Sequence, residues 1–226
     1  MTKIFFYKER ITLKKNMKKR KISLADIIDV LNMPDVEDWI LLTLHLSLDK
    51  KMKSELHLQK ALFIASQHLK RLKEILEFKP YRLGPYSDTL KEKLEVLENS
   101  NAIIVNERKE LILTKEGEEK IKSKKPTFSK EEIEYLSNIS NFVNTLSEKE
   151  LLLYIYVVYG AYEKSDVFNE LLKRRKEIAI EMLKKGAIST SLAAKLAGLS
   201  LPRFIKLLKQ KGIKPYKADE NDLRPL

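Results

Sequence analysis

The stretch that most constrains the fold is AAKLAGLSLPRFIKLLKQKGI, residues 193–213. Its three alanines allow a second helix to approach closely, and Gly198 suits a left-handed turn. Ser200 and Pro202 are typical of the start of a new helix, and Gly212 is typical of its end. The spacing therefore predicts two short helices joined by a tight turn, which is a helix-turn-helix.

The second helix of this pair is predicted to have an apolar side and a cationic side. At about 100° per residue, the apolar side holds Leu201, Phe204, Ile205, Leu207 and Leu208, and the other side holds Arg203, Lys206, Lys209 and Gln210. Residues 198–217 contain six basic residues and no acidic one. A solvated helix face normally mixes charges to gain i,i+4 pairs, so this pattern predicts a partner that supplies negative charge.

Double-stranded DNA is the partner that this pattern favours. The candidate DNA-binding residues are Thr190, Ser191, Lys195, Ser200, Arg203, Lys206, Lys209, Gln210 and Lys214. We expect Arg203, Lys206 and Gln210 to lie nearest the bases. Because one short helix reads few base pairs, we also expect a homodimer. The alternative is that the helix pair docks a protein, since the motif itself is only a packing geometry.

Residues 178–223 resemble a known family. The elements that carry the resemblance are a Lys-Gly before the motif, AAKLAGLS within it, an aromatic residue in the second helix, then GI, a Tyr and an acidic DL tail. They are similar to small, mostly archaeal and cyanobacterial, uncharacterised helix-turn-helix proteins that are often described as antitoxin-like. Those proteins usually carry a short strand before their first helix, whereas helix is predicted here.

Residues 34–122 are predicted to form a winged helix, which is three helices followed by a β-hairpin wing. One helix covers 34–48 and buries Trp39, Leu42 and Leu46, and a long one has its apolar face from Leu58 to Leu76. A turn-rich connector at 78–87 leads to Ser87, which would cap the third helix. AIIV and LILT, separated by NERKE, then predict a hairpin.

This region also resembles a known family. LQKALFIAS, YRLGPYSDTLKEKLEVLENSNAII and LTKEG are similar to winged-helix modules of the Panacea-type antitoxin-associated domain and related archaeal regulators. The third helix exposes four acids and two bases, which would repel phosphate. We therefore expect a structural or dimer-forming winged helix, with backbone contacts from Arg108 and Lys109 at the wing tip.

The other segments are assigned by composition. Residues 1–33 read as a basic extension, in which Lys18, Lys19 and Arg20 could contact phosphates or form only a tail. Residues 123–168 are predicted to hold a charged linker, KSKKPTFSK at 122–130, and apolar helices. Residues 169–226 hold the helix-turn-helix and a tail of mixed charge. The apolar run at 151–162 is either buried or part of a subunit contact, and burial is favoured.

Charge is segregated along the chain, whose net charge is +12. Residues 1–33 hold nine basic and three acidic residues, and residues 171–226 hold fourteen and five. Basic ends around a nearly neutral middle favour a polyanion-binding protein, although a heat-adapted surface would also be rich in Lys and Glu.

Other classes of function find little support. The chain has no Cys and only three His, His45, His57 and His68, without metal-ligand spacing. Phosphate-binding loops and nucleophile motifs are absent from the sequence. We expect no enzyme activity, no cofactor and no metal. The longest apolar run has 12 residues, short of the roughly 20 that span a bilayer, so we expect a cytoplasmic protein without membrane contact.

The sequence thus predicts a mainly α protein, a winged helix followed by a helical linker region and a C-terminal helix-turn-helix. We expect it to be a sequence-specific transcriptional regulator that binds double-stranded DNA. The alternative is an antitoxin or adaptor that binds a toxin protein through its C-terminal region.

Overall fold

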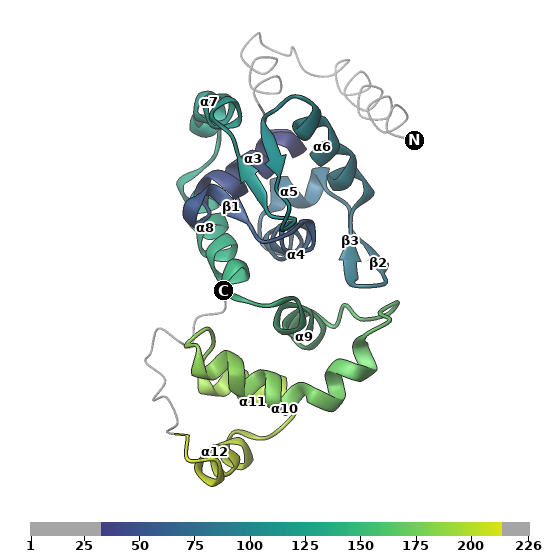
Figure 1. Ribbon diagram of the computed structural model, residues 1–226, viewed down its shortest axis with the longest axis vertical. Coiled ribbons are helices and arrows are strands. Elements are labelled where there is room, and N and C mark those ends of the chain that lie inside the picture. Colours follow the sequence, from purple (N-terminus) through teal and green to yellow (C-terminus); the bar gives the residue numbers. More distant parts are fainter. Residues whose placement is uncertain (1–32, 214–226) are drawn as a thin grey trace, which may run out of the picture. The chain divides into compact units, whose positions relative to one another are not determined.

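The structure is a computed structural model that describes residues 33–213. The candidate residues Lys18, Lys19, Arg20 and Lys214 lie outside the described residues. The described chain is mainly α-helical, with two small antiparallel sheets (Figure 1). Between residues 33 and 213, no helix combines the length and the apolar character that a membrane crossing needs.

The elements follow one another as short helices interrupted by very short strands. In chain order they are α3 (Val36–Leu46), η1 (Leu48–Lys50), β1 (Lys51–Met52), α4 (Glu55–Ser66), α5 (Lys70–Ile75), β2 (Lys79–Tyr81), β3 (Gly84–Tyr86), α6 (Asp88–Asn99), β4 (Ile103–Val105), β5 (Leu111–Leu113), α7 (Lys115–Lys124), η2 (Lys125–Thr127), α8 (Lys130–Thr145), α9 (Glu148–Tyr159), α10 (Phe168–Lys184), α11 (Thr190–Ala197) and α12 (Leu201–Gln210).

Helix α3 begins at a capping box. The Asp35 carboxylate accepts from the Asp38 backbone N–H at 2.9 Å, and the Asp38 carboxylate accepts from the Asp35 N–H at 3.2 Å. This satisfies two donors that the first turn leaves without helical partners. Trp39 and Leu42 are fully buried, as predicted, whereas Leu46 is only half-buried.

The long helix predicted through Leu58–Leu76 is wrong in one respect, because it is two helices. Helix α4 ends at Ser66 and α5 starts at Lys70, and Leu69 between them has extended dihedral angles. The apolar stripe nevertheless continues, since Leu69, Leu72 and Leu76 are all buried. The spacing of the apolar residues correctly predicted which side faces the core, but it did not predict the break between the two helices.

The predicted connector at 78–87 contains a β-hairpin that the sequence pattern did not predict. Strands β2 and β3 pair antiparallel with Pro80 opposite Pro85, and Gly84 takes the left-handed conformation at φ 76°. The hairpin is tied to α4 by two buried side chains. Gln59 donates to the Ser87 carbonyl and accepts from the Ser87 N–H, both at 3.0 Å, and the Lys60 ammonium donates to the Pro85 carbonyl at 2.7 Å.

The hairpin predicted from AIIV and LILT is present as β4 and β5. With β1 they form a three-stranded antiparallel sheet in the order β1-β5-β4. Thr114 caps α7 and its hydroxyl also donates to the Ala102 carbonyl at 3.0 Å. A Cβ on Gly117 would lie 2.1 Å from that same carbonyl oxygen, so the first turn of α7 packs this closely only because residue 117 is glycine.

Residues 122–130, predicted as a linker, are packed rather than extended. Helix α7 runs into η2, and Phe128 is buried with its ring edge-on to Trp39 at 4.8 Å between centroids. Arg71 of α5 donates to the Thr127 carbonyl at 3.1 Å and pairs with Glu132 of α8. Helix α8 packs against α3 and α4, so this segment belongs to the same core.

Burial was favoured for the apolar run at 151–162, and it holds for the first half of the run, whereas residues 157–159 of α9 are half-buried and Tyr162 is 43% exposed. Residues 151–156 are at most a few per cent exposed. On one side α9 contacts α4 and β3, and on the other it contacts α10 and α11 (Figure 1). It therefore joins the C-terminal helices to the rest of the described core.

Candidate nucleic-acid interface

The three C-terminal helices, α10, α11 and α12, end in the same way. Each is followed by a glycine with φ of 68° or 69°, at positions 186, 198 and 212. The residue after each glycine donates its N–H to the carbonyl five positions earlier, at 2.9 to 3.0 Å. This is the Schellman arrangement, which stops a helix and turns the chain sharply. Glycines at these positions therefore explain why three helices fit within about 45 residues.

Helix α11 begins at the Ser189 cap, whose hydroxyl accepts from the Leu192 N–H at 3.3 Å. Its alanines 193, 194 and 197 are buried, and the helix packs closely on α10. The small side chains predicted to permit a close crossing therefore do so, with Ile178 and Met182 of α10 buried in the same core.

Arg175 of α10 holds the other end of α11. Its guanidinium donates to the Leu196 carbonyl at 2.6 Å and to the Lys195 carbonyl at 3.1 Å. Both carbonyls lie in the last turn of the helix, where helical partners run out, and the Lys195 carbonyl also accepts from the Gly198 N–H at 3.1 Å. Burial lowers the pKa of Arg175. A Cβ on Gly198 would lie 2.5 Å from the guanidinium, so the turn before α12 needs glycine for its dihedral angles and for this contact.

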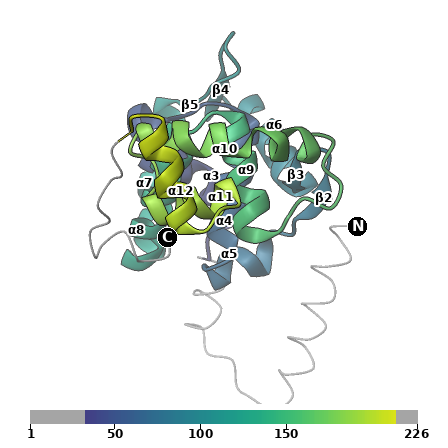
Figure 2. The same cartoon turned by 90° about the horizontal axis from the view of Figure 1, so that it is seen from below.

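Helix α12 is attached through one side. Phe204 and Leu208 are fully buried, Ile205 and Leu207 are half-buried, and Leu201, which was expected on the apolar side, is 42% exposed. Its packing partner is α11 (Figure 2). The remaining side is in contact with solvent and carries Arg203, Lys206, Lys209 and Gln210, all of them exposed.

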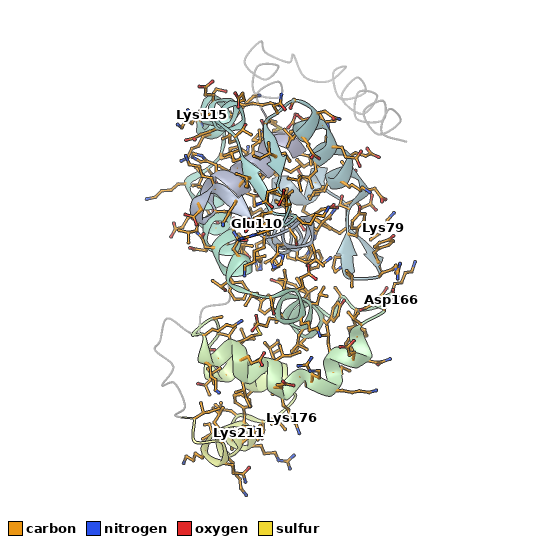
Figure 3. The ribbon with its side chains drawn as sticks, viewed as in Figure 1. Lys79, Glu110, Lys115, Asp166, Lys176 and Lys211 are labelled. Carbon is orange, nitrogen blue, oxygen red and sulfur yellow. The ribbon has the colours of Figure 1, made fainter. Side chains whose placement is uncertain are left out.

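The cations on this exposed side have no counter-charge within residues 33–213. Arg203, Lys206 and Lys209 form no ion pair there, and α12 contains no acidic residue. The nearest carboxylate that acts on a cation of this region is Glu177, and it acts on Lys211, just after the end of α12. The pKa of Glu177 on α10 is lowered mainly by Arg174, which bonds to it, and further by Lys211. Figure 3 shows Lys211 beside α12, below α10.

Two lysines elsewhere in the described chain show the contrast. Lys93 lies 2.9 Å from Glu37 and Lys185 lies 2.8 Å from Glu150. In both pairs burial of the carboxyl is the largest single effect and raises its pKa, but the hydrogen bonds and the lysine charges together outweigh burial, so the net shift is downward. For Glu150 the hydrogen bonds come from Ser147 as well as from Lys185. Helix α12 instead gathers its cations on one side without an acidic neighbour, and they leave a surface on which phosphate oxygens would find donors.

The other predicted residues of this region are placed unevenly. Ser191, Lys195 and Ser200 are exposed, and the Ser191 hydroxyl lies 3.1 Å from that of Ser189. Thr190 is only 5% exposed, so its side chain points into the fold at the first turn of α11. Sequence pattern could not separate Thr190 from Ser191, because both are hydroxyl residues beside the cap.

Arg108 and Lys109 lie at the tip of the β4–β5 hairpin, which extends away from the helices in Figure 2. Both are exposed. The Asn106 side chain accepts from the backbone N–H groups of Arg108 and Glu110 at 2.9 and 3.0 Å, and Lys109 has a left-handed φ of 64°. The tip is therefore ordered by Asn106, and it is separate from the surface on α12.

Sequence reasoning missed Arg175. It lies in the run KRRK at 173–176, where no local signal distinguishes the one side chain that turns toward α11. Within the described chain, no group of three His, Asp or Glu side chains is placed to hold a metal ion.

The described chain is thus a mainly helical protein whose C-terminal helices present a cationic surface. Residues 164–225, which include α10, α11 and α12, match the model of an uncharacterised protein family, UPF0175. This supports the predicted likeness of residues 178–223 to a small uncharacterised family. No curated protein matches the chain. The likeness of residues 35–122 to winged-helix modules remains a prediction.

Proposed function

We propose that the protein binds double-stranded DNA in a sequence-specific way and regulates transcription. The observation that carries the proposal is the exposed side of α12, where Arg203, Lys206 and Lys209 have no carboxylate partner among residues 33–213. Duplex DNA carries a dense row of phosphates, and each cation that neutralises one releases a condensed counterion. The absence of counter-charge on α12 is what such a surface requires.

The geometry of the helix pair supports a division of roles. In a helix-turn-helix the second helix enters the major groove, with residues near its start contacting base edges. Arg203 and Lys206 lie in the first two turns of α12 on its exposed side, so they would reach the bases. Gln210 is the last residue of α12 and lies on the same side four residues further along, so it would read a base only if the groove follows the whole helix. Ser191, Lys195 and Lys209 would then contact the phosphates on either side.

The N-terminal part supports the proposal of a winged helix. The order α3, β1, α4, α6, β4, β5, with β1 paired to β5 and β5 to β4, is the order expected for three helices and a wing. The β2–β3 hairpin and α5 are additions between the second and third helices. In this proposal α6 is structural, because its unpaired exposed charges are chiefly acidic, and the wing tip supplies backbone contacts through Arg108 and Lys109.

A homodimer is part of the proposal. One short helix covers too few base pairs to select a site, and paired half-sites multiply the selectivity. Light scattering of the purified chain, with and without a selected duplex, would give the stoichiometry directly.

The decisive experiment compares two double charge reversals. Arg203→Glu with Lys206→Glu changes the surface of α12, whereas Lys115→Glu with Lys130→Glu makes the same change in net charge at exposed first-turn positions of α7 and α8. Fluorescence anisotropy with a random duplex, followed by selection from a randomised pool, would measure both affinity and specificity.

We expect the α12 reversal to reduce duplex affinity by at least 100-fold and the control reversal to reduce it by less than threefold. Equal losses would mean that only net charge matters, and an unchanged affinity in the α12 variant would refute the assignment of this helix. If no sequence is enriched from the pool, the protein binds DNA without sequence preference, and the proposed regulatory role is wrong.

A second candidate function is an antitoxin or adaptor that binds a protein, such as a toxin, through this region. It is favoured by the 42% exposure of Leu201 at the start of α12, since an apolar side chain gains little from a phosphate backbone. A protein partner would give a complex whose affinity depends weakly on salt and falls on Leu201→Ser. Duplex affinity should instead be insensitive to Leu201→Ser.

A further inference from the structure

A cleft of about 580 Å³ lies between α4, the β2–β3 hairpin and residues 166–167. Its walls include Leu56, Lys60, Tyr81, Leu83, Tyr86 and Val167. Figure 3 shows Asp166 near the hairpin that carries Lys79. The volume lies within the range of about 300–1,000 Å³ that is common for small-molecule sites. The cleft is separate from the cationic surface of α12.

Lys60 is the unusual member of this lining. It is 2% exposed, and within the described chain its ammonium group donates to the Pro85 carbonyl at 2.7 Å. An ammonium has three donors, and no carboxylate in the described chain lies within ion-pair distance of it. Burial lowers the pKa of Lys60 to about 8, an effect that the charge of Glu55 partly offsets.

A purely structural role does not account for the charge. A neutral amide could hold the Pro85 carbonyl equally well, and neighbouring Gln59 holds Ser87 in that way. Burying a cation without a paired anion is unfavourable. The charge would be compensated if an anion entered the cleft.

The rest of the lining indicates the chemistry of the uncharged part of such a ligand. Tyr81 and Tyr86 lie together with ring centroids 5.0 Å apart, and Leu56 and Leu83 add apolar surface. The exposed pair of Arg82 and Asp166 lies in the lining as well, and these two charges already compensate one another. Glu55 also lines the cleft and its charge acts on Lys60, but within the described chain the two side chains form no ion pair. A ligand that matches has an aromatic body and one negative group.

We propose that this cleft binds a small aromatic carboxylate. Its carboxylate would pair with the Lys60 ammonium, and its ring would lie against Tyr81 and Tyr86. Val167, which lines the cleft, is also the N-cap residue that precedes α10, so an occupant would contact the chain where it enters the C-terminal helices. The proposal does not depend on DNA binding.

Titration calorimetry of the full chain with benzoate and with 1-naphthoate tests the proposal, and benzamide and 1-naphthamide serve as neutral isosteres. We expect saturable 1:1 binding of at least one carboxylate below millimolar concentration, and at least tenfold weaker binding of its amide. Lys60→Met should abolish this difference between acid and amide.

A second variant, Leu83→Trp, tests the proposal even if Lys60→Met does not fold. Leu83 is 38% exposed, so a larger side chain there can be accommodated by the fold while it fills the cleft, and we expect at least a tenfold loss of carboxylate affinity. Lys91→Met, an exposed change on α6, is the matched control and should bind as the wild type does. Absence of saturable binding, equal binding of acid and amide, or unchanged binding in Leu83→Trp would overturn the proposal.

Discussion

Helices α6 and α12 are both short amphipathic helices that follow a turn, yet their charges are arranged in opposite ways. Helix α6 buries Leu90, Leu94 and Leu97, and its Lys93 pairs with Glu37 of α3. Helix α12 buries Phe204 and Leu208 and leaves its cations unpaired within the described chain. The buried stripe is what attaches a helix to the protein. The pairing of the charges on the other side indicates whether that side is already in contact with the protein's own charged groups or is open to a partner.

The largest expected effect concerns how each helix is attached. Phe204→Ala should cost about 3–5 kcal/mol and Leu94→Ala about 2–5 kcal/mol, because both remove fully or nearly fully buried side chains. Hydrogen exchange would distinguish them. Phe204→Ala should raise exchange mainly in α11 and α12, since α12 packs chiefly on α11, whereas Leu94→Ala should raise it in α3 and α6 together. A global loss of protection from Phe204→Ala would contradict the local attachment of α12.

The next comparison uses the residues that stop α6 and α11. Helix α6 is followed by Asn101 at φ 54°, and α11 by Gly198 at φ 68°. Asn101→Gly should be neutral within a few tenths of a kcal/mol, because glycine adopts this conformation freely. Gly198→Asn should cost about 1–3 kcal/mol although Asn tolerates the same angles, since its Cβ would displace Arg175 and break that side chain's charge-assisted hydrogen bonds.

Gly186→Asn is the matched control for that change. Gly186 has φ 69°, and a Cβ added there would meet nothing within 4 Å, so only the dihedral cost remains and we expect less than about 1 kcal/mol. Urea unfolding midpoints of the three variants would measure the differences. Equal costs at positions 186 and 198 would mean that Arg175 does not hold the turn.

A smaller effect separates paired from unpaired charge. Glu37→Gln should lose about 1 kcal/mol at pH 7, because both Lys93 and Lys120 bond to this carboxylate but are themselves partly exposed. The pKa of Glu37 is lowered in the folded chain. The stabilisation is therefore complete above the unfolded pKa near 4.5 and disappears as pH falls through the lower folded value.

The expected measurement is a difference in unfolding free energy between Glu37→Gln and wild type that is constant from about pH 8 to 6 and shrinks below the unfolded pKa near 4.5. Lys206→Gln on α12 should change the free energy of unfolding by less than about 0.5 kcal/mol at every pH in this range, since an exposed unpaired side chain contributes little to folding. A destabilised Lys206→Gln would reveal a counter-charge for α12 in the protein itself.

The smallest effect is a change of slope. For duplex binding, the logarithm of affinity against the logarithm of salt concentration should become shallower by about 0.9 in Lys206→Ala, which removes one phosphate contact. Lys91→Ala on α6, an equally exposed lysine, should leave the slope unchanged. If both changes reduce the slope equally, α6 also contacts DNA and the contrast between the two helices is wrong.

Local signals in the sequence predicted much of the C-terminal region. Gly198 and Gly212 act as predicted because a left-handed turn depends on a few consecutive residues. The apolar stripe of α12 was correct except for exposed Leu201, which lies in the first turn of the helix. The hairpin of β4 and β5 was also predicted, since its strands are adjacent in the chain.

Features that join distant segments were not predicted. The break after Ser66 coincides with packing of α4 and α5 against α8, including the Arg71–Glu132 pair, whose members are 61 residues apart. The β2–β3 hairpin depends on Gln59 and Lys60 of another helix. Burial of Thr190 and the turn of Arg175 toward α11 are decided by which side of a helix meets its neighbour.

The sequence by itself determined the turn at Gly198, the end of α12 at Gly212 and which cations lack an acidic neighbour along α12, because these depend on bonds and spacings within a few residues. Only the tertiary structure decided that Arg175 holds α11, that Lys60 is buried beside a cleft, and that α6 has its lysine paired with α3. The physical reason is that the environment of a side chain depends on segments that are tens of residues away in the sequence. The local sequence pattern does not indicate which of those segments will pack against it.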